Sequence, residues 1–302
     1  MYNSVLCEPR TVKCAFIREH KYKYPAGLMC QLLGVSSSGF YGWLETPHKT
    51  ELMQQIDEIF QHKKKRYGSP RIWRELKNRG IRVGKQMVED LMREMGLKAR
   101  PRKRYRSTTD SNHNLPIAPN ILERKFNIDK VDSAWLSDIT YLPLIDGGFV
   151  YLCVVMDLAS REIVGWYVDD NMEAKLVCQA FLNAILSRAN APRGAIFHSD
   201  RGSQYSSEQF RKLLELYGLR QSMSRRAQCW DNAPMESFFG SLKEEYNEDP
   251  MFWFTNLEDA RSGLFEYIEI FYNRQRMHSG IGYLIPACYV SPIDSHVEIE
   301  LT

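Results

Sequence analysis

The chain has 302 residues, of which 44% are hydrophobic and 25% charged, and its formal net charge is +3. The length is enough for two or three domains at roughly 100–200 residues each. No apolar run approaches the roughly 18 residues of a membrane-spanning helix, which excludes an integral membrane protein. The opening residues lack the layout of a secretory signal, so we expect a cytoplasmic protein with no membrane partner.

The cysteines also indicate a reducing compartment. There are seven, they are scattered along the chain, and none forms a CxxC pair, which is typical of reduced thiols rather than of a disulfide framework. A zinc site that combines His20 with Cys7, Cys14 and Cys30 is an alternative. Because the paired spacing of zinc ligands is missing, we do not favour it.

The positive charge is concentrated in one short segment. Residues 61–106 carry 17 Lys and Arg side chains against four Asp and Glu, whereas residues 107–302 carry 17 against 27. A solvated helix face is the alternative, but such a face usually mixes the two signs of charge. The segment therefore favours a phosphate backbone as its partner.

The first pair of predicted helices lies within residues 26–44. A turn at Gly34 separates the two helices, and a serine among residues 36–38 caps the second one. Two short helices around a tight turn fit a helix-turn-helix, although a plain helical hairpin has the same pattern.

A second pair of helices is predicted in the basic segment. Residues 69–80 begin with Ser69 as the cap and Pro70 in the first helical position, and residues 81–96 form the second helix. Residues 98–107 are too charged to pack and are expected to lie along a phosphate backbone. The candidate DNA-binding residues of this segment are all basic: Arg71, Arg74, Lys85, Arg100, Arg102, Lys103 and Arg104.

The composition changes after the basic segment. Residues 107–127 are rich in Ser, Thr, Asn and Pro, which predicts a linker. The elements predicted beyond it are strands at 134–144, 149–156, 162–168, 195–198 and 219–224 and helices at 173–189, 206–218 and 234–246. Three strands joined by hairpins and followed by alternating helices and strands predict an α/β fold of the ribonuclease H-like order.

Three carboxylates fall on neighbouring elements of this predicted fold. Asp138 lies within the first strand, Asp200 just beyond the fourth, and Glu236 in the last helix, and ligands of open α/β sheets gather at such strand ends. Taken singly, they can be a satisfied polar residue of a strand, an Asx-turn residue and a first-turn glutamate, respectively. Because all three belong to adjacent elements, we interpret them together as one site.

Such a site requires a cation. Two carboxylates 4 Å apart repel each other by about 4 kcal/mol at an effective dielectric constant of 20. All-oxygen ligands select Mg²⁺ or Mn²⁺ over zinc, and a pair of such ions is the usual means of in-line displacement at phosphorus. We therefore predict two ions at Asp138, Asp200 and Glu236. Gly240 and Lys243 follow Glu236 along one edge of its helix, where Lys243 can neutralise a phosphate.

The spacing of these residues resembles that of a known family. Asp200 and Glu236 are separated by 35 residues, and Lys243 follows Glu236 by seven, which resembles the DD(35)E pattern of retroviral-integrase-like transposases. The stretches WLSDITYLP, FHSDRGSQY, CWDNAPMESFFGSLKEE and YNRQRMHSGIGYLIP resemble the second-reading-frame transposases of the bacterial insertion sequence family three. RYGSPRIWRELKNRGI resembles the basic helix-turn-helix module of that family. The resemblance extends from residue 15 to about residue 290.

The resemblance implies an integrase catalytic core in which Asp138, Asp200 and Glu236 are catalytic and bind Mg²⁺, while Lys243 contacts DNA. It implies a transposase, in which water and then a DNA 3′-hydroxyl attack phosphodiester bonds at the ends of a mobile element. The implied partners are double-stranded DNA of the element ends and the target, further copies of the chain, and an upstream-frame product joined by frameshift fusion or by association. A bacterial transposase is expected at the nucleoid.

The stretches that resemble the family contain further residues outside the acid triad. His198 could contact DNA, but we expect it to fill the wall of the site. Trp230, Asp231 and Asn232 are expected to cap and anchor the helix that follows them. The role of the signature from Tyr272 to His278 is open. The zinc-binding HHCC module of retroviral integrases is absent from the sequence, so the basic helical segment is expected to bind DNA in its place.

Five segments are predicted in all. They are a helix-turn-helix-like segment (1–60), a basic DNA-binding module (61–106), a linker (107–127), the catalytic core (128–250) and a helical extension of the core (251–302). Two other functions remain as alternatives. One is a ribonuclease H-type nuclease that hydrolyses without joining, and the other is a non-catalytic regulator that occupies the DNA ends.

Overall fold

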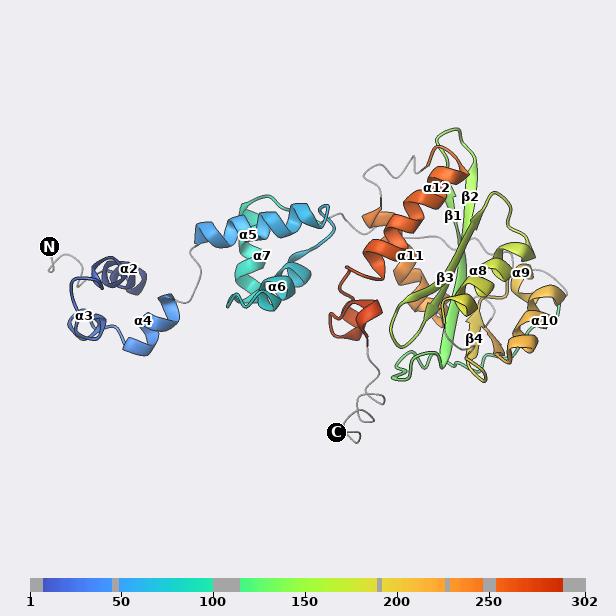
Figure 1. The fold of residues 1–302 in the computed structure, drawn as a ribbon, viewed down its shortest axis with the longest axis horizontal. Helices are drawn as coiled ribbons and strands as arrows, with labels where there is room; N and C mark the ends of the chain where they lie inside the picture. The colour runs from blue at the N-terminus through green and yellow to red at the C-terminus, as the bar shows by residue number, and fades with distance from the viewer. Residues whose placement is uncertain are drawn as a thin grey trace. The chain divides into compact units, whose positions relative to one another are not determined.

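The computed structural model describes residues 8–44, 49–99, 115–188, 192–225, 229–246 and 254–289. The chain divides into two compact units, Met1–Arg100 and Pro101–Thr302, and each is described by itself (Figure 1). None of the helices in these described ranges is long and apolar enough to cross a membrane.

The first module of the N-terminal unit consists of three short helices, α2 (Arg10–His20), α3 (Ala26–Leu33) and α4 (Ser37–Leu44). Their shared core contains Cys14, Ile17, Met29, Cys30, Leu33, Val35 and Phe40. Gly34 ends α3 in the left-handed conformation with φ +66°, and Ser36 Oγ accepts a hydrogen bond from Gly39 N at 3.1 Å. The predicted turn and serine cap are confirmed, because both depend on local backbone requirements.

The second module contains α5 (Lys49–His62), α6 (Ser69–Asn78) and α7 (Lys85–Glu94). The predicted cap of α6 is wrong: Gly68 is the N-cap, Ser69 is the first helical residue and Pro70 the second, and no side chain caps the helix. The predicted start of α7 at residue 81 is also wrong. Residues 81–84 are not helical, and the carbonyl of Val83 instead accepts a hydrogen bond from Trp73 Nε1 at 2.9 Å.

The C-terminal unit is built on a five-stranded sheet with the strand order β3-β2-β1-β4-β5. The strands are β1 (Ala134–Pro143), β2 (Phe149–Asp157), β3 (Ile163–Asp169), β4 (Ile196–Ser199) and β5 (Arg220–Met223). The first three strands pair antiparallel, and β4 and β5 join them in parallel. The predicted ribonuclease H-like α/β order is confirmed.

Helices cover both faces of this sheet. On one face lie α8 (Ala174–Leu186), α9 (Ser203–Ser206) and α10 (Glu208–Tyr217), and on the other α11 (Ala233–Glu245), α12 (Leu257–Phe265) and the π-helical turn Glu266–Tyr272 (Figure 1). Gly165 allows α8 to pack closely on β3, since a Cβ there would lie 2.4 Å from Ala180 O and 2.5 Å from Ala184 N.

The segment before β1 packs against the sheet although it forms neither helix nor strand. Residues 107–127 are predicted to be a linker, and the structure describes those from 115 onward. Leu122 is buried, and the N–H groups of Ile121 and Leu122 donate to Ser222 Oγ at 3.0 and 3.3 Å. The end of this segment is therefore tied to β5.

Candidate active site

The parallel pairing of β1 with β4 places Asp138 beside Asp200. Leu136 is paired with His198 across these strands, and each aspartate lies two residues further along the chain. Side chains two residues apart point to the same face of a sheet. Asp138 lies within β1 and Asp200 directly follows β4, so both carboxylates belong to the carboxyl end of this strand pair.

Local hydrogen bonds orient both aspartates. Asp200 Oδ1 accepts from Gly202 N at 2.9 Å, and Asp138 Oδ1 accepts from Ile139 N at 2.9 Å. The contact to Gly202 is the Asx turn that was considered as an alternative role for Asp200. Because this turn engages one carboxylate oxygen, it is compatible with a second role as a ligand.

Glu236 comes from the first turn of α11, and α11 packs against β1. Burial raises the pKa of Glu236. Burial also raises the pKa of Asp138 well above its usual range, the carboxylates of Asp200 and Glu236 raise it further, and Lys243 opposes the shift. Negative charge is therefore crowded at Asp138, and the three acids share one electrostatic environment.

Lys243 lies on α11 near Asp138 and is partly shielded from solvent. Its Nζ is 5.1 Å from the centre of the Tyr141 ring. Burial lowers the pKa of Lys243 to about 8, against the opposing effect of Asp138. This lysine is thus a half-buried member of the site.

The acids do not form a closed metal cage as they stand. Among the residues that the structure describes, no three His, Cys, Asp or Glu side chains are grouped so that they could hold a metal ion. Of the zinc alternative, Cys7 lies outside the described residues, and Cys14, His20 and Cys30 are not grouped in this way. The donors at Asp138 are nevertheless all carboxylate oxygens under mutual repulsion, which is the chemistry that suits a hard divalent cation.

His198 forms part of the wall, as expected. The side chain is fully buried, and its two ring nitrogens hydrogen-bond with Ser222 Oγ at 2.8 Å and Ser224 Oγ at 3.2 Å. Burial lowers the pKa of His198 to about 4, against the opposing effect of Asp231. The imidazole is therefore neutral at physiological pH and supports the site from inside.

A buried acid fixes the segment just before α11. Asp231 is fully buried and accepts hydrogen bonds from Asn120 Nδ2 at 3.0 Å, from Arg225 N at 2.9 Å and from the side chains of Arg225 and Arg124. Burial acts to raise the pKa of Asp231, but the bonds from Arg225 and Arg124 outweigh it and hold that pKa well below its usual range. The expected anchoring role of Asp231 is visible in these contacts.

Asn232 holds α11 in a way that differs from the expected cap. It occupies the N-cap position, but its side chain makes no capping hydrogen bond. Instead, Asn232 Nδ2 donates to the carbonyl of Ser137 at 3.2 Å. Since Ser137 precedes Asp138 in β1, this contact ties the start of the Glu236 helix to the strand of the first aspartate. The side chain of Trp230 is outside the described residues.

The other end of α11 is held by the C-terminal signature, whose role the sequence left open. Arg276 donates from Nε to Glu245 Oε2 at 2.8 Å, and from its terminal nitrogen to Glu245 Oε1 at 2.7 Å and Ser241 Oγ at 2.9 Å. Tyr267 OH donates to the same glutamate at 3.1 Å. Arg276 and Glu245 are both buried, so they form an internal ion pair. Both halves lay in stretches that resemble the family, but nothing in the sequence indicated that they pair.

A second residue of the signature binds the edge of the sheet. Asn273 Oδ1 accepts from Ile163 N at 2.9 Å, and Asn273 Nδ2 donates to Ile163 O at 2.9 Å. Ile163 opens β3, the outer strand. The signature therefore joins β3 to the segment that holds α11.

The predicted DNA-binding residues are placed only in part. Arg71 and Arg74 lie on α6 and Lys85 begins α7. The guanidinium of Arg71 stands over the Tyr67 ring at 5.5 Å. The remaining four, Arg100, Arg102, Lys103 and Arg104, lie outside the described residues.

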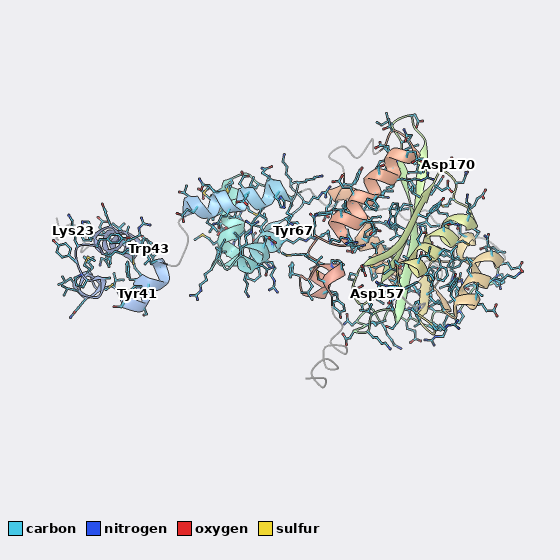
Figure 2. The ribbon with its side chains drawn as sticks, in the orientation of Figure 1. Lys23, Tyr41, Trp43, Tyr67, Asp157 and Asp170 are labelled. Atoms are coloured by element: carbon cyan, nitrogen blue, oxygen red, sulfur yellow. The ribbon has the colours of Figure 1, made fainter. Side chains whose placement is uncertain are left out.

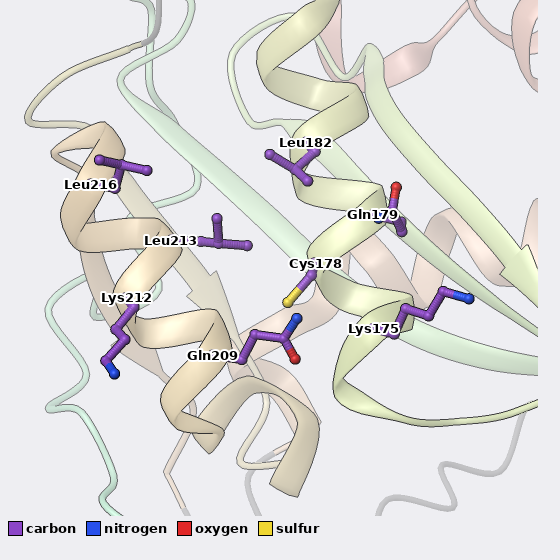
Figure 3. Close-up of a pocket in the computed structure, with 8 residues that line it drawn as sticks. All are labelled: Lys175, Cys178, Gln179, Leu182, Gln209, Lys212, Leu213 and Leu216. Atoms are coloured by element: carbon purple, nitrogen blue, oxygen red, sulfur yellow. The ribbon is translucent and has the colours of Figure 1, made fainter.

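A hollow of about 310 Å³ between α8 and α10 is separate from the acids (Figure 3). It has no carboxylate in its lining, which consists of Lys175, Cys178, Gln179, Leu182, Gln209, Lys212, Leu213 and Leu216. The hollow is therefore not where a cation would be ligated.

Comparisons with known proteins agree with the two units. Models described as "Integrase core domain" match residues 129–229 and 217–286, and a model described as "HTH-like domain" matches residues 47–105. The chain is 38% identical to transposase InsF for insertion sequence IS3A of Escherichia coli strain K12, over 91% of this chain and 97% of the relative. It is 40% identical to an uncharacterized 31 kDa protein of insertion element IS600 of Shigella sonnei, over 86% and 97%.

Among solved structures, one match is to a chain of the simian T-cell lymphotropic virus intasome in complex with PP2A regulatory subunit B56 gamma. The identity is 14% and the TM-score 0.41, over 65% of this chain and 63% of that chain.

Proposed function

The chain belongs to the IS3 family of transposases, and from this premise we propose that Asp138, Asp200 and Glu236 are the catalytic residues of its integrase core. The enzyme is a DDE-type polynucleotidyl transferase. The observation that carries the residue assignment is the register of β1 and β4, which sets Asp138 beside Asp200. The effect of Glu236 on the pKa of Asp138 adds the third acid to the same place.

The same three residues would hold Mg²⁺ or Mn²⁺, and we propose two ions per site. Their carboxylates provide only oxygen donors, which suits these metals. When bound, the ions would supply the positive charge that stabilises the attacking and leaving oxygens at phosphorus.

The chain's own residues account for the remaining steps. The Asn232 and Arg276 contacts set where α11 presents Glu236. Lys243, half-buried with a lowered pKa, would face the DNA phosphate next to the acids and neutralise it. The neutral His198 is buried two residues before Asp200 and would keep water from that side of the strand end.

DNA is the substrate in this proposal, both at the element ends and at the target. The basic module would contact its backbone through Arg71, Arg74 and Lys85 and through the following arm, which the structure does not describe. Two ends must be joined together, so several copies of the chain would assemble on DNA. Fusion or association with an upstream-frame product and a place at the bacterial nucleoid are parts of the same proposal.

A strand-transfer assay tests the assignment. The purified chain, a pre-cleaved duplex that ends in the terminal sequence of the element, a plasmid target and Mg²⁺ should yield joined products. Asp200→Asn should abolish joining, whereas Asp170→Asn, the same change at an exposed aspartate, should not. Both variants should bind the duplex like the wild type.

The alternatives give other results in this assay. Cleavage without joined products would identify a nuclease. A chain that binds the duplex and neither cleaves nor joins it, with Asp200→Asn indistinguishable from the wild type, would identify a regulator and refute the catalytic assignment.

A further inference from the structure

The three-helix module of residues 8–44 is outside the HTH-like match, which begins at residue 47. In this module α2, α3 and α4 each pack against the other two. The left-handed Gly34 and the Ser36 cap set the path from α3 into α4. The geometry of a helix, a tight turn and a second helix is thus built by local contacts.

The exposed face of α4 is polar but uncharged. Phe40 is fully buried and turns the opposite face of the helix inward. Ser38, Tyr41 and Gly42 are exposed, and the relative exposure of Tyr41 is 52%. Tyr41 is labelled on α4 in Figure 2. These three positions are spaced by three and four residues, so they share one face. Hydroxyl groups on this face can both donate and accept hydrogen bonds.

One helix supplies a cation near each end of α4. Arg10 of α2 donates to Gly39 O at 2.9 Å in the first turn of α4. Arg18 of α2 stands over the ring of Trp43, 5.7 Å from its centre, in the last turn. Their α-carbons are about 12 Å apart along α2, at 1.5 Å per residue. Gly39 permits the first contact, since a Cβ there would lie 2.4 Å from the Arg10 guanidinium.

A hydroxyl-bearing helix face with guanidinium groups along one flank has the features of a base-reading element. We propose that α4 enters the major groove of duplex DNA and contacts base edges through Ser38 and Tyr41, while Arg10 and Arg18 bind the backbone phosphates beside it. An α-helix fits that groove, which is about 12 Å wide. Contacts to phosphates position a protein, and contacts to bases specify the sequence. The choice of DNA as ligand rests on the proposed function.

Gly42 provides a direct test of this face. A Cβ added at Gly42 meets nothing within 4 Å, and the same is true at Gly27 on α3. Gly42→Glu therefore places a carboxylate on the proposed DNA-facing surface without disturbing the core. Gly27→Glu is the matched control, because it makes the same change at another exposed helical glycine of the same module.

The experiment is a selection by the full-length chain from duplexes with a randomised centre, in EDTA so that no strand is cut. The wild type and Gly27→Glu should enrich the same motif. Gly42→Glu should lose a contiguous block of roughly three to four base pairs of that motif. Tyr41→Ala should weaken the preference within the same block. Thermal unfolding checks that all variants fold. If Gly42→Glu enriches the unchanged motif, or if the wild type enriches none, the proposal is overturned.

The arginines predict a different signature. Arg10→Gln and Arg18→Gln should weaken binding equally on selected and scrambled duplexes, and each should reduce the slope of log affinity against log salt by about 0.9. An unchanged slope for both variants would refute the phosphate contacts.

Strand transfer from a pre-cleaved end separates this proposal from the catalytic one. Gly42→Glu at high protein concentration should still join DNA, since its acids are intact. Motif selection without any joining by the wild type would overturn the proposed function and leave α4 as a DNA reader. Joining by the wild type, together with a motif that Gly42→Glu does not alter, would support the proposed function and overturn α4 as the DNA reader.

Discussion

The buried acids at the two ends of α11 and the acids proposed to be catalytic have opposite electrostatic surroundings. Asp231 and Glu245 are buried and bonded to arginines, and the pKa of Asp231 is held well below its usual range. Asp138 lies among other carboxylates, and its pKa is raised well above its usual range. The difference separates carboxylates that are paired with arginines from carboxylates that repel one another, and the proposed cation would relieve that repulsion.

The largest expected effect comes from changing Asp138, one of the acids proposed to be catalytic. Asp138→Asn should reduce strand transfer by about 10³-fold or more, as expected for loss of one member of a catalytic unit. It should also raise the unfolding temperature in metal-free buffer, because it removes charge from a crowded site. Joining assays and thermal unfolding in EDTA measure the two effects. A stability loss equal to that of an ordinary buried-polar mutation would mean that Asp138 is a structural residue.

The second-largest expected effect tests the arginine-paired acids, through Arg276. Arg276→Ala leaves the buried Glu245 carboxylate without its ion-pair partner, and loss of one partner of a buried pair costs about 3–5 kcal/mol. The free energy of unfolding in urea measures this cost. The double variant Arg276→Met/Glu245→Gln is the control, since removing both charges should recover most of the loss. A single variant within about 1 kcal/mol of the wild type would show that the pair contributes little.

The two sides of the comparison also differ in how well the sequence predicts them. Asp138, Asp200 and Glu236 could be proposed as candidates because each lies at a strand or helix position that residue patterns define, and because their spacing resembles that of a family. The turn at Gly34 and the Ser36 cap were predictable for the same reason, since each depends on a few adjacent residues.

Long-range contacts were not predictable. The Arg276–Glu245 pair joins residues 31 positions apart, and the Asn120–Asp231 bond joins residues 111 positions apart. Composition alone made the segment around Asn120 look like a linker. Neither pairing follows from periodicity or propensity, because each depends on where the folded sheet places its neighbours. The fold order predicted that Asp138 and Asp200 share a site, but the residue-level register between β1 and β4 came from the structure.

The pH dependence of the free energy of unfolding tests the buried His198 beside the proposed catalytic acids. Burial lowers its pKa from 6.5 to about 4, so below pH 6.5 the unfolded chain binds a proton that the folded chain does not. Stability contributed by the neutral imidazole is complete above pH 6.5 and is lost as the pH falls toward 4. The free energy of unfolding should drop by about 2 kcal/mol between pH 7 and pH 5.

Urea unfolding of the wild type and of His198→Asn at each pH measures this loss. The variant should be less stable at pH 7 and should show a flatter pH dependence. Equal slopes for the two proteins would assign the acid sensitivity to other groups.

The smallest expected effect concerns Asn232, which lies in the sequence between the arginine-bonded Asp231 and the proposed catalytic Glu236. Asn232→Ala removes the bond to the Ser137 carbonyl and should cost about 1 kcal/mol of stability. Ser207→Ala is a matched control, because it removes the cap of α10, in which Ser207 Oγ accepts from Phe210 N, at a similar cost of about 1 kcal/mol. Strand transfer should fall in the first variant and not in the second, because Asn232, unlike Ser207, ties the Glu236 helix to the strand of Asp138. Equal activities at equal stability would show that Glu236 reaches the aspartates without this link, and its position would then have to come from Asp231 and Arg276.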